Sequence, residues 1–174
     1  NSARVIQWYA ETIDKTYDEI APAPRNALAM ITREPLGVIG AVVPWNYPMM
    51  ITSWKLGPAL AMGNSIVVKP AENSSLSALK MAELAVAAGL PAGVFNVVPG
   101  LGAEAGQALA RHMDVAKIAF TGSGPTGRKM MQYAAESNMK QVSLELGGKS
   151  PQVVLNDCTD LEAAASTIAW AIYY

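Results

Sequence analysis

The sequence of 174 residues has very little cysteine and histidine, with one of each, Cys158 and His112. A single cysteine cannot form an internal disulfide, and neither residue type is frequent enough for a multi-cysteine or multi-histidine metal site. A Ser-His-Asp triad would have to use His112, which lies in the segment RHMD at the expected end of a helix. Cys158 lies in the polar turn NDCTD. We therefore predict no metal site and assign no catalytic role to either residue.

An excess of charge and a long apolar run are also lacking. Lys and Arg number 13 and Asp and Glu number 14, so the formal net charge is −1 at pH 7. This balance gives no reason to expect a nucleic acid or an anionic membrane surface as partner. Apolar residues make up 51% of the chain, but no run approaches the roughly 20 residues of a membrane helix. We expect a small-molecule partner and a reducing, cytoplasmic location.

What the sequence does contain is a regular series of β-branched segments. VIGAVV (38–43), SIVV (65–68), VFNVV (94–98) and VAKIAF (115–120) recur at intervals of roughly 20 to 30 residues, which suits βαβ units. These segments are apolar throughout instead of alternating, so both faces of their strands should be buried. The predicted fold is therefore α/β, a doubly wound parallel sheet with helices on both sides and one sizeable core.

Helices are expected between these strands. They should run from Pro48 to the Gly63-Asn64 break, from candidate caps at 73–75 to Gly89, from about 104 to 111, from Pro125, and from 160 onward. Apolar residues at helical spacing also predict an amphipathic helix over residues 1–20, ended by two prolines, with an extended piece, ALAMITREP, after it. The chain begins NSARV and ends inside the apolar segment AWAIYY, so we expect a longer protein around it.

Glycine-rich turns follow two of the predicted strands. FTGSGPTG (120–127) contains a G-x-G-x-x-G pattern at Gly122, Gly124 and Gly127, between a strand and a helix. Such a turn can present backbone N–H groups to a phosphate, but it is equally consistent with a tight strand-to-helix connection. Gly102 and Gly106, after PG at 99–100, lie at another such turn and could simply mark the connection.

Three further segments carry side chains suited to chemistry. In VVKPAE, Lys69 and Glu72 follow a strand and could hydrogen-bond ribose hydroxyls, or they could form a solvated strand exit. In PWNYP, two prolines restrict the backbone around Asn46, whose carboxamide could stabilise an oxyanion or could belong to an ordinary turn. In LELGGKSP, Glu145 stands beside two glycines and a lysine, without a plausible nucleophile in the chain for it to serve.

In the order PWNYP, WKLGPAL, VVKPAE, PGLG, FTGS and LELGGKSP, these segments resemble the aldehyde dehydrogenase superfamily. The resemblance extends from about Arg33 to the end of the chain. It implies that residues 1–36 form an N-terminal helix and part of an oligomerisation arm. Residues 37–174 would form an incomplete Rossmann-like NAD-binding domain, truncated before the catalytic domain. The segment around ALAMITREPLGVIGAVVPWN is similar to family members that act on the aminoaldehydes of putrescine breakdown.

The resemblance also implies roles for individual residues. Asn46 corresponds to the oxyanion-hole side chain, Glu145 to the general base, and Lys55 to a lysine implicated in proton relay. The cofactor is expected to be NAD, with NADP as the alternative. The residues expected to bind it are Trp45, Lys69, Glu72, Gly102, Gly106, Phe120, Gly122, Ser123, Gly127 and Leu146.

In that family a cysteine thiolate attacks the aldehyde, a hydride passes to NAD, and the glutamate activates the water that hydrolyses the thioester. The nucleophile is expected beyond Tyr174, and Cys158 is not a substitute for it. The resemblance therefore predicts part of a homo-oligomeric enzyme that oxidises an aldehyde to a carboxylic acid. The alternative is a nucleotide-binding or assembly module without catalysis.

Overall fold

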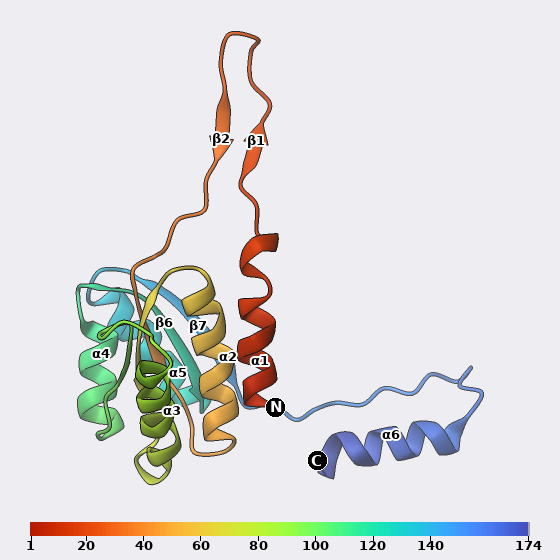
Figure 1. Cartoon of the computed structure of the whole chain (residues 1–174). Coiled ribbons are helices and arrows are strands. Elements are labelled where there is room, and N and C mark those ends of the chain that lie inside the picture. The colour runs from red at the N-terminus through yellow and green to blue at the C-terminus, as the bar shows by residue number, and fades with distance from the viewer. Residues whose placement is uncertain (174) are drawn as a thin grey trace.

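The computed structural model describes residues 1–173 and contains a five-stranded parallel sheet in the order β5-β4-β3-β6-β7 (Figure 1). The strands are β3 (Val38–Val42), β4 (Ser65–Lys69), β5 (Phe95–Val97), β6 (Val115–Gly122) and β7 (Gln141–Leu146). The chain winds from central β3 to β4 and β5, then crosses to β6 and β7 on the other side. The expected doubly wound parallel sheet is confirmed. Tyr174, the last residue of the predicted domain, lies outside the described residues.

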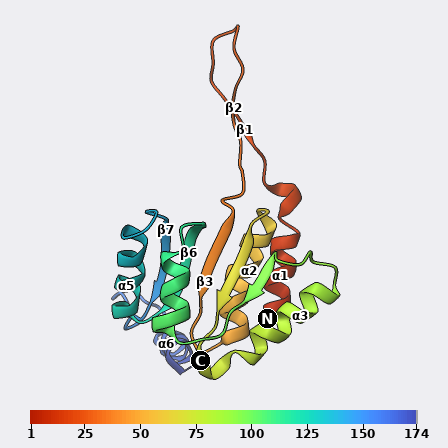
Figure 2. The same ribbon diagram turned by 90° about the vertical axis from the view of Figure 1, so that its left-hand side faces the viewer.

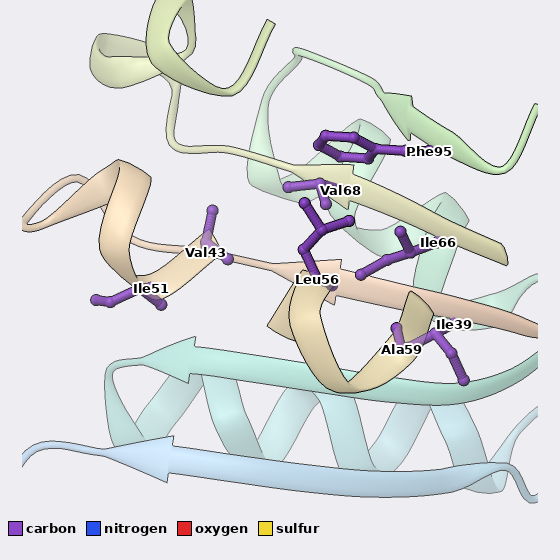
Figure 3. Close-up of a cluster of buried hydrophobic side chains, with 9 residues drawn as sticks. Ile39, Val43, Ile51, Leu56, Ala59, Ile66, Val68 and Phe95 are labelled. Atoms are coloured by element: carbon purple, nitrogen blue, oxygen red, sulfur yellow. The ribbon is translucent and has the colours of Figure 1, made fainter. Parts of the chain in front are cut away.

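Helices cover both faces of this sheet (Figure 2). The helices α2 (Pro48–Ala61) and α3 (Leu76–Ala87) lie on one face, and α4 (Gln107–Arg111) and α5 (Gly124–Ala135) lie on the other. One buried cluster, shown in Figure 3, joins Ala41 and Val43 of the central strand region to Leu56 of α2. The other joins Val42 to Met130 of α5. Neighbouring residues of one strand thus enter opposite cores, which explains why the strands are apolar throughout.

The predicted helix boundaries hold at most positions. Gly89 adopts φ +97 just after α3, a conformation that favours glycine, and Asp160 Oδ1 accepts a 2.9 Å hydrogen bond from Ala163 N at the start of α6 (Leu161–Tyr173). The cap expected at 73–75 is correct in position, because Ser75 is the N-cap residue of α3. Residues Glu72–Ser74 form a 3-10 turn, and the Ser75 side chain makes no cap hydrogen bond because the turn has already brought the chain into helical geometry.

The helix predicted over residues 1–20 is wrong in its second half. Helix α1 covers Ser2–Ala10 only, a 3-10 turn follows at Ile13–Lys15, and β1 (Glu19–Ala21) pairs antiparallel with β2 (Ala29–Ile31) in a projecting hairpin (Figure 1). Thr12 Oγ1 donates to the Tyr9 carbonyl at 2.7 Å, a local bond that competes with helix continuation. The extended conformation expected for ALAMITREP is confirmed at β2.

The C-terminal part of the described chain stands apart from the sheet. Residues 147–160 run outward as an extended connection, and α6 lies beyond them without a buried residue (Figure 1). Among residues 1–173, no helix combines the length and apolarity that a bilayer crossing requires. The same residues contain no group of three or more His, Cys, Asp and Glu side chains suited to a metal ion.

Candidate functional site

A cleft of about 710 Å3 opens where β3, β6 and β7 end. The lining residues are Pro44, Trp45 and Asn46 after β3, Trp54 and Lys55 from α2, Thr121, Gly122 and Ser123 at the end of β6, and Glu145, Leu146 and Gly147 at the end of β7. β3 and β6 are neighbours at the point where the winding of the chain reverses. Open α/β sheets bind ligands outside the carboxyl ends of the strands at such a point.

The structure brings the three predicted catalytic residues, Asn46, Lys55 and Glu145, to this one cleft. Glu145 occupies the end of β7 and is paired in register with Thr121 of β6. Burial lowers the pKa of Lys55, while the negative charge of Glu145 acts in the opposite direction. The charge of Glu145 therefore acts on Lys55 across the cleft. A lysine with a lowered pKa beside a carboxylate can exchange protons with a bound ligand.

Asn46 lies in a constrained loop between β3 and α2. The next residue, Tyr47, has φ +49, an uncommon value for a residue with a side chain, and Pro48 begins α2 immediately afterwards. Within residues 1–173 the Asn46 carboxamide has no protein hydrogen-bond partner, and the residue is exposed. Its N–H groups are therefore free to donate to a ligand oxygen in the cleft.

Four of the predicted cofactor residues form a second cluster beside the end of β4. Lys69 is buried, and its Nζ donates a 2.9 Å hydrogen bond to Oε1 of the half-exposed Glu72. This hydrogen bond is the main reason that the pKa of Glu72 is lowered, with a smaller contribution from the Gly102 backbone. Gly102 and Gly106 bound a π-helix whose backbone lies next to Glu72 and Lys69. Such π-helical turns often occur at functional sites.

The remaining six predicted cofactor residues fall into two groups. Trp45, Gly122, Ser123 and Leu146 line the cleft, and Ser123 is the N-terminal flanking residue of α5. Phe120 and Gly127 do not line the cleft, and both are buried. A Cβ on Gly127 would lie 2.8 Å from Leu146 Cδ2, so the glycine allows α5 to approach β7 closely.

Sequence reasoning missed Trp54 and Thr121 as cleft residues. Both lie inside segments that had been singled out, WKLGPAL and FTGS, so their position beside Lys55 and Gly122 was the available signal. Cys158 Sγ donates to the Asp160 carbonyl at 3.5 Å in the connection before α6, and His112 Nδ1 accepts from Asp114 N after α4. Neither of these two residues lines the cleft.

Comparison with known proteins gave one family and many relatives. The model described as "Aldehyde dehydrogenase family" matches residues 1–174. The NADP/NAD-dependent aldehyde dehydrogenase PuuC of Escherichia coli (strain K12) is 59% identical, and the alignment covers 99% of this chain and 35% of that protein. The aminoacetaldehyde dehydrogenase of Pseudomonas aeruginosa is 60% identical over 94% of this chain and 33% of its own length.

Solved structures agree in fold. The gamma-glutamyl-gamma-aminobutyraldehyde dehydrogenase from Burkholderia cenocepacia J2315 has a TM-score of 0.94 at 58% identity, covering 99% of this chain and 35% of that chain. An indole-3-acetaldehyde dehydrogenase in complex with NAD+ has a TM-score of 0.95 at 55% identity, with the same coverage. The chain therefore spans about a third of the length of the relatives that it matches.

Proposed function

Because the chain belongs to the aldehyde dehydrogenase family, we propose that it is the nucleotide-binding part of an enzyme that oxidises an aldehyde to a carboxylic acid with NAD or NADP. The observation that carries this proposal is the convergence of Asn46, Lys55 and Glu145 on the cleft beside the Gly122-Ser123 turn. An amide donor, a carboxylate base and a lysine that relays protons are three of the groups that aldehyde oxidation through a thioester uses, besides the thiol nucleophile.

Each of the three residues in the cleft would have one chemical role. The Asn46 carboxamide would donate a hydrogen bond to the aldehyde oxygen as negative charge develops on it. Glu145 would remove a proton from the water that attacks the thioester, and Lys55 would carry that proton away from the cleft. Cys158, the single thiol of the chain, does not line the cleft, so the nucleophile is assigned to the remainder of the complete protein.

The dinucleotide would be held by the second cluster and by the glycine turn. The exposed side of Glu72, whose Oε1 is held by Lys69, would accept hydrogen bonds from ribose hydroxyls. Gly102 lies next to this carboxylate, since a Cβ at Gly102 would be in ordinary van der Waals contact with Glu72 Oε1 at 3.9 Å. The Gly122-Ser123 turn at the start of α5 would hold the pyrophosphate. The cofactor, when bound, supplies the hydride acceptor of the reaction.

The substrate class is proposed to be an aminoaldehyde of putrescine breakdown. Two relatives at 58 and 60% identity are named for aminoaldehydes, the gamma-glutamyl-gamma-aminobutyraldehyde and aminoacetaldehyde dehydrogenases. In this chain, Trp45 and Trp54 give the cleft apolar walls suited to the methylene part of such a substrate.

Residues 1–36 are proposed to be the N-terminal helix and oligomerisation arm, and residues 37–174 part of the NAD-binding domain. The hairpin supports a homo-oligomer, because an isolated two-stranded hairpin is marginally stable and its Ile20 and Met30 side chains are exposed. The single cysteine is consistent with the reducing conditions of the cytoplasm, which is the proposed location.

The proposal is tested on the complete protein with NAD and a panel of aliphatic and amino-aldehydes. The wild type should give steady production of NADH. The variant Glu145→Gln should give a burst of about one NADH per active site and then stop, because hydride transfer precedes the hydrolysis that needs the base. Glu83→Gln, at an exposed position of α3, is the matched control. Binding of NAD without reduction by any aldehyde would instead support the non-catalytic module.

A further inference from the structure

The Trp54 side chain separates two pockets of the molecule and lines both. On one side it lines the cleft that holds Glu145. On the other side it lines a groove of about 330 Å3 together with Arg4, Val5, Trp8 and Tyr9 of α1. Helix α1 therefore lies directly behind one wall of the proposed substrate site, although none of its residues lines that site.

The contact between the two helices depends on Gly57. A Cβ at this buried position would lie 2.5 Å from Cδ2, 3.1 Å from Cγ and 3.3 Å from Cβ of Tyr9. Rotation of the Tyr9 side chain can relieve the contact with Cδ2 but not the tight contact with Cβ, so α1 itself would have to move by a few tenths of an ångström. The Trp8 and Tyr9 rings also pack edge to face, with 4.8 Å between their centroids, and this contact restricts rotation of the Tyr9 ring.

The turn of α2 that carries Trp54 lacks one backbone hydrogen bond. Pro58 lies inside α2, four residues after Trp54. Because proline has no N–H group, the Trp54 carbonyl does not receive the hydrogen bond that residue 58 would otherwise donate. Trp54 and Gly57 are three residues apart on the helix and so share a face. The packing of α1 therefore contributes more to the position of Trp54 than it would in an uninterrupted helix.

We propose that α1 is the outer support of the Trp54 wall, with Tyr9 and Gly57 as positioning residues that determine where the carbon chain of the aldehyde lies relative to Asn46 and Glu145. This inference rests on the proposed function. It assigns to α1 an influence on substrate specificity that acts through Trp54, without contact between α1 and the aldehyde.

The test compares a long aliphatic aldehyde with acetaldehyde in the complete protein. Gly57→Ala should raise the KM for the long aldehyde about tenfold, the size of a weakened apolar contact in a pocket. The KM for acetaldehyde, which is too short to use the wall, and the KM for NAD should change less than about twofold. Gln7→Ala, on the exposed side of α1, is the control and should leave all three values unchanged.

Tyr9→Ala provides a second route if Gly57→Ala does not fold. It should raise the KM for the long aldehyde in the same selective way, and the double variant should be no worse than Tyr9→Ala, because the clash has been removed. Equal KM changes for both aldehydes, or additive effects in the double variant, would overturn the inference. A wild type that oxidises no aldehyde would refute the proposed function, whereas an active wild type with unchanged variants would refute only the role of α1.

Discussion

At the scale of single residues, Asn46 offers a direct test of oxyanion stabilisation. Its carboxamide faces the cleft without a protein partner, so its removal should not disturb the fold. We expect Asn46→Ala to lower kcat of the complete protein by about 100- to 1000-fold, as measured when one oxyanion donor is lost. Steady-state kinetics and a thermal melt check both statements, with exposed Asn156→Ala as control. A variant that unfolds would show that Asn46 stabilises the turn between β3 and α2 instead.

Glu72 should determine the choice of cofactor. The Lys69 hydrogen bond lowers the pKa of this carboxylate, so it is ionised at neutral pH. A 2′-phosphate at the same position would bring like charges together, and we expect kcat/KM to favour NAD over NADP by about tenfold or more. Glu72→Gln should reduce that preference. Equal kcat/KM values for the two cofactors in the wild type would argue against a ribose contact at Glu72.

Lys55 should make stability depend on pH in a predictable direction. Burial lowers its folded-state pKa below the ordinary value of 10.5. The unfolded chain therefore binds this proton more tightly, and the unfolding free energy rises with pH from the folded-state pKa up to 10.5. Lys55→Met should raise the melting temperature at neutral pH, and this gain should shrink as the pH approaches 10.5. Exposed Lys80→Met, the control, should show no such trend.

At the scale of elements, two glycines of α5 give a matched pair of substitutions. A Cβ at Gly127 would lie 2.8 Å from Leu146 Cδ2 and 3.5 Å from Leu144 Cδ1, whereas nothing lies within 4 Å of a Cβ at Gly124. Gly127→Ala should therefore destabilise the protein by up to about 1 kcal/mol, the low end of the cost of overpacking, because the nearest atoms belong to the end of the flexible Leu146 side chain, which is 44% exposed. Gly124→Ala should be neutral or slightly stabilising, since alanine favours helix. Urea unfolding of both variants measures the difference, and equal effects would contradict close packing of α5 on β7.

At the scale of the whole molecule, the polypeptide of residues 1–174 should be catalytically inactive by itself. Its cleft contains a base and an amide donor but no thiol. Without covalent attachment the aldehyde loses positioning worth several kcal/mol, about 7 or more in favourable cases. We expect no reduction of NAD with any aldehyde, followed by absorbance of the reduced cofactor. Turnover that Cys158→Ser abolishes would overturn the exclusion of that cysteine.

The same polypeptide should associate with itself. Ile20 and Met30 of the hairpin and Trp170 of α6 are exposed, at 77, 63 and 70%. Exposed apolar surface of this kind marks protein contacts or promotes aggregation. Sedimentation velocity at several concentrations should show species larger than the monomer. A monomer throughout the concentration range would show that these residues are tolerated in water.

The sequence by itself determined the sheet, most helix boundaries and the family. Apolar strands such as Val38–Val42 require burial on both faces, and residues such as Gly89 and Pro125 mark helix ends through local backbone geometry. These are short-range properties, so they can be read along the chain. The motif order from PWNYP to LELGGKSP is likewise a property of the chain itself.

Only the tertiary structure decided features that depend on contacts between distant residues. The hairpin replaced the second half of a predicted helix, because Arg33 N donates to Asp18 Oδ1 from 15 residues away and its side chain contacts Glu19. Lys55 and Glu145 share a cleft because β3, β6 and β7 are neighbours in the sheet. Trp54 separates that cleft from α1 because Gly57 admits Tyr9. Long-range packing of this kind leaves no periodic signal in the sequence, and it decides which residues face the site and which support it from behind.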